Sequence, residues 1–145
     1  MNENLELLLE IYNSSNMGVY TTNVLINTLK NKDNKIKKLL EDELKIYEEY
    51  MKKTSKILTK KKIVLKGAGI MAKIMSNASI KAESLKDNSD ASIASTLIEG
   101  FTMGITSINI SISKYKKETK SSYMKLAKKY LKFHEEEIDK LKAFI

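Results

Sequence analysis

The chain has 145 residues, with 26 basic against 18 acidic side chains and a formal net charge of +8. This length fits one domain with a single core, and the absence of cysteine excludes disulfides, thiolate metal sites and a cysteine nucleophile. The absence of proline, with only five glycines, favours long helices over a β-sandwich.

The positive charge comes from lysine alone, because the sequence contains no arginine. Lysine lacks the planar fork with which arginine grips phosphate or reads guanine. Nucleic-acid binding is therefore disfavoured, although lysines can still give a salt-sensitive attraction to polyanions.

The first half of the chain predicts a helical hairpin over residues 3–58. Its first helix runs to about residue 30, and Asp33 is the expected N-cap of a second helix that starts near residue 35. The apolar stripes expected to face the core recur at three- and four-residue spacing: Leu5, Leu8, Leu9, Tyr12, Val19, Ile26 and Leu29, then Ile36, Leu39, Leu40, Leu44, Tyr47, Met51 and Leu58.

The second half predicts a connecting helix over about residues 67–86 and a second hairpin over about residues 91–144. Within it, Ile108, Ile110 and Ile112 alternate with polar residues as in a strand, but a longer window follows the helical period, and we expect a helix. The stretch 91–113 carries one charge and is long enough to span a bilayer, yet it is nearly half Ser, Thr, Asn and Gly. We expect it to be a buried central helix.

The two hairpins resemble each other in sequence. Met17-Gly18 recurs as Met103-Gly104 at an offset of 86, and Glu48-Glu49 recurs as Glu135-Glu136 at an offset of 87. Tyr47 thereby corresponds to His134. This pattern indicates a duplicated hairpin and hence a four-helix bundle.

The length of the connection adds a topological prediction. A helix of about 18 residues covers roughly 27 Å, so the second hairpin can begin at the opposite end of the bundle from where the first one stops. This is the long-crossover arrangement of ferritin-like bundles. Gly18 and Gly104, in the middle of helices, indicate close helix–helix approach at equivalent places.

The chain resembles an uncharacterised family of ferritin-like helical bundles of clostridia and related bacteria. The resemblance covers nearly the whole chain and is carried by Met17-Gly18 and by Leu97–Ile105, with support from Tyr47-Glu48-Glu49 and Glu135-Glu136. It implies the fold and brings no established activity with it.

The ligand pattern of ferritin-like di-iron proteins, a Glu-x-x-His on each of two helices, is absent from this sequence. The single histidine, His134, follows Leu131 by three residues. His134 and Glu137 could hold one ion with help from Glu43 or Glu48. The alternative, which we favour, is structural: Tyr47, His134, Asn23 and Asn109 form a polar layer in the core, and Glu135-Glu136-Glu137 is a solvated face.

The sequence thus predicts one all-α domain over residues 1–145, a ferritin-like four-helix bundle from a duplicated hairpin with an additional helix in the crossover. We assign no catalytic, cofactor-binding or metal residues and no cofactor. The expected role is a non-enzymatic structural or interaction protein, with an unknown protein partner or self-association as a homodimer. The acidic N-terminus lacks the pattern of a signal peptide, so we expect a cytoplasmic protein.

Two alternative functions stay open. The first is a metal-binding redox or storage protein with an atypical site near His134. The second is a lysine-rich binder of a membrane or nucleic-acid surface, through lysines such as Lys60–Lys62 beside the crossover.

Overall fold

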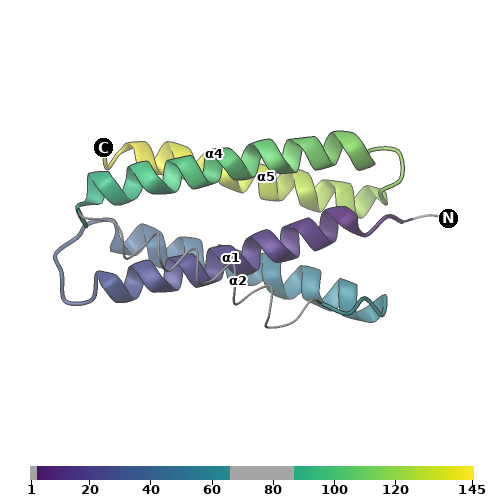
Figure 1. Cartoon of the computed structure of the whole chain (residues 1–145), viewed down its shortest axis with the longest axis horizontal. Helices are drawn as coiled ribbons and strands as arrows, with labels where there is room; N and C mark the ends of the chain where they lie inside the picture. The colour runs from purple at the N-terminus through teal and green to yellow at the C-terminus, as the bar shows by residue number, and fades with distance from the viewer. Residues whose placement is uncertain (1–2, 66–86) are drawn as a thin grey trace.

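The computed structural model describes residues 3–65 and 87–145, and these residues form four packed α-helices without a strand (Figure 1). The helices are α1 (Glu6–Thr28), α2 (Lys37–Lys60), α4 (Asp90–Tyr115) and α5 (Ser121–Lys142). The predicted all-α class and four-helix count are confirmed for this part of the chain, and the helix ends lie within a few residues of those expected. The helix predicted over residues 67–86 lies outside the described residues.

The helices pair as two antiparallel hairpins, α1 with α2 and α4 with α5, which lie side by side (Figure 1). Leu29 and Ile36 are fully buried at the two ends of the first turn, so the turn is anchored by apolar packing. No described helix combines the length and apolar character needed to cross a membrane.

The end of α2 and the start of α4 lie at opposite ends of the bundle. At one end, the Asn34 side chain in the α1–α2 turn donates hydrogen bonds to Asn88 O at 2.8 Å and to Asp90 Oδ1 at 2.9 Å, at the start of α4. At the other end, Lys61 Nζ just after α2 lies 2.7 Å from Glu3 Oε2. The chain therefore leaves α2 at one end of the bundle and enters α4 at the other (Figure 1).

Helix α4 resolves the conflict between strand and helix patterns in favour of a helix. Ser89 caps its start, with Oγ accepting a hydrogen bond from the backbone N–H of Ser92 at 3.2 Å. Ile108 is buried, whereas Ile110 is 62% exposed, as the helical period requires. The expectation of a buried central helix is wrong in part, because α4 buries one face and presents the other outward.

Aromatic rings pack within a core that is otherwise largely aliphatic. The Tyr47 ring on α2 packs edge-on against Phe133 on α5 at a centroid distance of 5.2 Å, and Phe101 on α4 packs edge-on against His134 at 5.2 Å. Such pairs contribute about 0.5–1.5 kcal/mol beyond their burial. These aromatic side chains help to fill the space between the hairpins.

Two glycines, which the sequence analysis singled out as sites of close helix–helix approach, make room for two of these rings. A Cβ on Gly18 would overlap the ring of Tyr47, and a Cβ on Gly104 would lie 2.9 Å from Cδ2 and Nε2 of His134. Each hairpin therefore holds one ring from its second helix against the backbone of its first.

We expect Gly18→Ala to destabilise the protein. Alanine is favoured over glycine in a helix by about 1 kcal/mol, but forcing the Tyr47 ring to move costs roughly 1–3 kcal/mol. The matched control is Gly100→Ala, because no heavy atom lies within 4 Å of a Cβ at that position; it should stabilise by up to about 1 kcal/mol. Denaturant unfolding measures both, and equal stability of the two variants would contradict the packing described.

Candidate functional site

Polar side chains lie in the middle of the core, on the inner faces of α2 and α5. We call the set the buried polar layer; its members are Glu43, Tyr47, Tyr130, His134 and Glu137, all of which are buried. They recur three or four residues apart, so each helix places them on one stripe. The layer carries the buried Glu and His side chains of the core and is the main chemical feature of the described residues.

His134 is held as a neutral ring. Its Nδ1 lies 2.9 Å from the backbone O of Tyr130; because a carbonyl can only accept, Nδ1 donates, and in the neutral ring the proton is absent from Nε2. Burial lowers the pKa of His134 to about 4, although the bond to Tyr130 opposes the shift. The imidazole is therefore uncharged at neutral pH.

Tyr130 ties the layer to the first hairpin. Its hydroxyl lies 2.7 Å from Ser14 Oγ on α1, and burial raises the pKa of Tyr130. A second polar link joins α1 to α4, where Ser107 Oγ donates to Glu10 Oε1 at 2.7 Å. These bonds fix how the two hairpins are placed relative to each other.

The two carboxyl groups of the layer are the anomaly of this core. Glu43 is 0% exposed and Glu137 is 1% exposed, and no described group donates a hydrogen bond to any of their four oxygens. Lys140 Nζ lies 3.4 Å from Glu137 Oε2 as an ion-pair partner from the surface. An ionised carboxylate buried without donors is costly by several kcal/mol.

Protonation relieves most of this cost at Glu43. Burial, with a smaller effect from the charge of Glu137, raises the pKa of Glu43 to about 8. Burial also raises the pKa of Glu137, which the charge of Lys140 opposes. At neutral pH the Glu43 carboxyl group is mostly protonated.

The structure brings together some of the residues singled out in the sequence. His134, Glu137 and Glu43 are all buried in the layer, whereas Glu48 is only half-buried. Among the described residues, no three His, Asp or Glu side chains lie close enough together to hold a metal ion. Two buried carboxyl groups therefore support the metal-site hypothesis, but the described residues provide no complete set of ligands.

Part of the predicted polar layer is wrong. Tyr47 and His134 are buried as expected, but Asn23 and Asn109 are exposed. On α1 the neighbouring Thr22 faces the core instead, and its hydroxyl donates to Gly18 O at 2.6 Å. The inner face of α1 is therefore displaced by one residue from the position that the asparagine pair suggested.

The prediction that Glu135-Glu136-Glu137 is a solvated face is also wrong for Glu137. Glu135 and Glu136 are exposed, while Glu137 points into the core. The signal was present in the spacing, because Glu137 lies three residues after His134 and four before Leu141, on the buried stripe of α5. Glu43 stands likewise between Leu40 and Tyr47 on α2.

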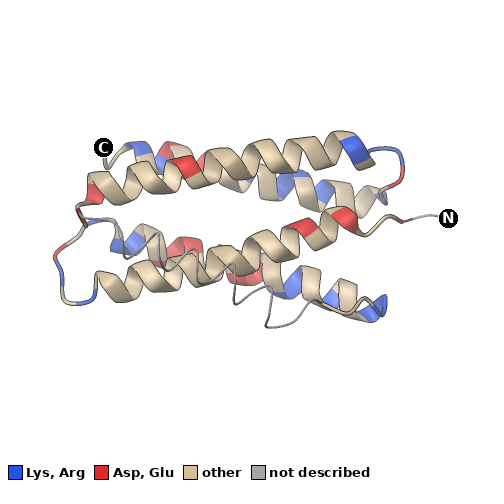
Figure 2. Ribbon diagram, in the orientation of Figure 1, with Lys and Arg blue, Asp and Glu red and all other residues tan. Residues whose placement is uncertain are grey.

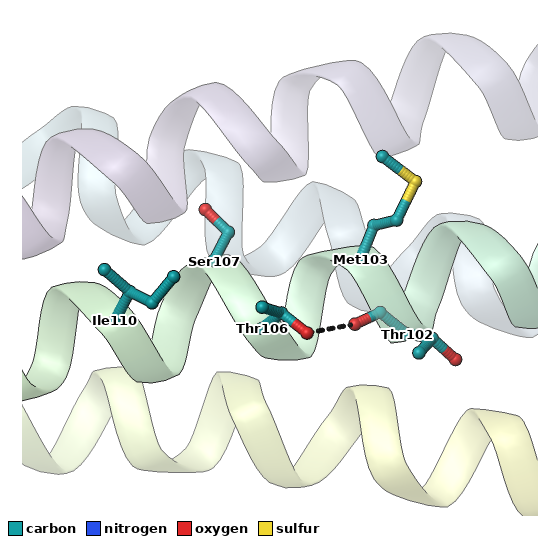
Figure 3. Close-up of a pocket in the computed structure, with 5 residues that line it drawn as sticks. All are labelled: Thr102, Met103, Thr106, Ser107 and Ile110. Carbon is teal, nitrogen blue, oxygen red and sulfur yellow. Dashed lines mark hydrogen bonds between the residues drawn. The ribbon is translucent and has the colours of Figure 1, made fainter.

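A second feature lies along α4, on the side that borders α1. A shallow pocket of about 380 Å³ is lined by uncharged side chains alone. Figure 3 shows Met103 and Ser107 pointing toward α1 from one side of the helix. Met103 is 67% exposed and Ile110 is 62% exposed. We call this surface the α4 pocket; its lining residues are Thr102, Met103, Thr106, Ser107 and Ile110.

Comparison of the chain with protein-family models, with curated proteins and with solved structures finds no match.

The buried polar layer predicts a particular pH dependence of stability. Because the folded pKa of Glu43, about 8, lies above its ordinary value of 4.5, this group stabilises the fold below pH 4.5 and loses that contribution as the pH rises through 8. His134, with a folded pKa of about 4 against 6.5, contributes above pH 6.5 and loses its contribution as the pH falls through 4. Between pH 4.5 and 6.5 the two effects oppose each other. Their summed contribution to the free energy of unfolding is therefore largest in this range and falls at lower and at higher pH.

Glu43→Gln tests the alkaline side. From pH 4.5 to 8 the free energy of unfolding of the variant should rise relative to wild type by on the order of 4 kcal/mol. Denaturant titrations at several pH values measure this difference. Glu49→Gln, which removes an exposed carboxylate from the same helix, should keep the wild-type profile. Parallel profiles for Glu43→Gln and wild type would refute the assignment.

Proposed function

We propose that the protein is a non-enzymatic, cytoplasmic interaction protein built on a ferritin-like frame, and that the α4 pocket is where it self-associates. The observation that carries the proposal is the exposure of Met103 and Ile110 on one uncharged face of α4. They lie seven residues apart, which is about two helical turns and hence the same side.

The surrounding charge pattern supports a second copy of the chain as the occupant. Charged residues make up 30% of the sequence, yet none occurs between Gly100 and Ser113 on α4 or between residues 11 and 29, which span most of α1. Two copies that each carry a net charge of +8 repel each other. An uncharged face lets them meet without opposing their lysines, and covering a large apolar side chain contributes about 1.5–3 kcal/mol.

The ferritin-like frame and its duplication belong to the same proposal. The passage of the chain from one end of the bundle to the other between α2 and α4 supports the ferritin-like frame. The matching contacts of Tyr47 with Gly18 and of His134 with Gly104 support the duplication, since these residues correspond at offsets of 87 and 86. Close approach of ring and glycine at equivalent places is what a duplicated hairpin would preserve.

Met103→Lys tests self-association through the α4 pocket. The wild-type chain should dimerise, and the variant should weaken the dimer at least tenfold, because losing a buried methionine removes about 1.5–3 kcal/mol and 1.4 kcal/mol is a factor of ten. Sedimentation equilibrium gives both dissociation constants. Thr59→Lys, at an exposed position on α2, adds the same charge away from the pocket and should leave the dimer intact. A wild-type monomer at all concentrations would overturn the proposal, as would equal weakening by both variants.

A second candidate function, cation binding in the buried polar layer, is favoured by the carboxyl groups of Glu43 and Glu137 that lack hydrogen-bond donors. A divalent cation could replace the proton that Glu43 otherwise holds. Glu43 and Glu137 would supply oxygen ligands. Among the described residues no third His, Asp or Glu side chain lies close enough to complete the ligand set, and Nε2 of His134 faces Gly104.

Elemental analysis by mass spectrometry, on protein purified without chelator or metal-affinity resin, decides this candidate. Near-stoichiometric iron, manganese or zinc in the wild type, lost in Glu43→Gln and retained in Glu49→Gln, would establish the site. A folded wild-type protein that is free of metal would retire it. The fold of each variant is checked by circular dichroism before the metal content is compared.

A further inference from the structure

Lysines gather at the end of the bundle where α2 and α4 finish. Figure 2 shows blue at the end of α2, at the end of α4 and in the turn that follows α4. We call this surface the basic end. Its seven lysines are all exposed: Lys60, Lys61, Lys62, Lys114, Lys116, Lys117 and Lys120.

Three separate parts of the chain are joined at the basic end. The Glu3 carboxylate forms ion pairs with Lys61 Nζ at 2.7 Å and with Lys120 Nζ at 3.5 Å. The backbone N–H of Lys120 also donates a hydrogen bond to Glu3 O at 3.1 Å. The Asn4 side chain donates to Glu118 Oε2 at 2.9 Å. The lysines of α2 and of the α4–α5 turn are therefore held as one surface.

The opposite end of the bundle differs in its balance of charge. Among the described residues, seven lysines at this end (Lys30, Lys32, Lys35, Lys37, Lys38, Lys140 and Lys142) stand among six acids (Asp33, Glu41, Asp42, Asp87, Asp90 and Asp139), and two of the acids form surface ion pairs with Lys38 and Lys142. In the described part of the chain, the basic end has three acids: Glu3, Glu6 and Glu118. Excess positive charge thus belongs to one end.

An apolar side chain stands beside these lysines. Val64, four residues after the end of α2, is 88% exposed and is the most exposed of the large hydrophobic side chains among the described residues. Its neighbours Ile63 and Leu65 pack in part against the core.

We propose that the basic end docks on the surface of an anionic lipid membrane, with the lysines facing the headgroups and Val64 entering the boundary with the acyl chains. Clusters of four to eight lysines are of the size that binds anionic leaflets, at roughly 1 kcal/mol for each lysine. A peripheral contact of this kind needs no membrane-spanning segment. It uses a different surface from the α4 pocket and does not rest on self-association.

Membrane is favoured over nucleic acid by two observations. Lysine acts as a point charge, sufficient for lipid headgroups, and the chain has no arginine for bidentate phosphate or base contacts. A nucleic-acid backbone also offers no apolar layer for Val64, whereas a bilayer does.

The test is cosedimentation with vesicles of 70% phosphatidylcholine and 30% phosphatidylserine, compared with vesicles of phosphatidylcholine alone. The full chain should bind only the anionic vesicles, and binding should weaken at high salt. The triple variant Lys60→Gln, Lys116→Gln, Lys117→Gln should bind about a hundredfold more weakly, from the contribution of each lysine and the conversion of 1.4 kcal/mol to a factor of ten. It leaves Lys61 and Lys120, the partners of Glu3, unchanged.

The matched control is Lys30→Gln, Lys32→Gln, Lys35→Gln, which removes the same net charge from the opposite end and should bind like wild type. Val64→Ser should weaken vesicle binding severalfold, while Ile145→Ser, at an exposed position outside both surfaces, should not. Absence of binding to anionic vesicles would overturn the proposal, and so would equal losses in the two triple variants. Tighter binding to a DNA duplex than to vesicles, with no effect of Val64→Ser, would assign the surface to nucleic acid instead. Circular dichroism confirms that each variant is folded.

Discussion

The packing of two rings against two glycines is the constraint on which the rest of this bundle depends. Tyr47 lies over Gly18 and His134 lies over Gly104, so in each hairpin one ring lies directly against the backbone of the neighbouring helix. From these positions the rings reach Phe101 and Phe133, which fill the space between the hairpins. The hairpins are consequently joined by side chains of fixed shape, and a protein interior tolerates little change in such shapes.

The same inner faces that carry the rings also carry acids. Glu43 lies one turn before Tyr47, and Glu137 lies one turn after His134, so the helical period that places the rings in the core places the carboxyl groups there too. Their burial raises the pKa of both carboxyl groups above the ordinary value for glutamate. This gives an otherwise structural layer chemical properties, because a buried carboxyl group must hold a proton or meet a cation.

The surface shows a separation of a different kind. The outward side of α4 between Gly100 and Ser113 carries no charge, while lysines lie along α2 and α5, at the end of α4 and in the turns. Among the described residues only one end has a clear excess of lysine over acid, because the other end mixes the two. A protein with a net charge of +8 therefore offers an uncharged face and a basic end, two surfaces suited to different partners.

The sequence by itself determined the all-α class, the four helices and the crossing of the chain from one end of the bundle to the other, because these follow from helical periodicity, from the absence of proline and from the length of the connection. It also pointed to Gly18 and Gly104 as sites of close approach. Only the tertiary structure decided that Glu43 and Glu137 face inward and that Asn23 and Asn109 face outward. The physical reason is that periodicity defines a stripe on a helix but leaves its rotation uncertain by about one residue, and that rotation is set when the helices pack.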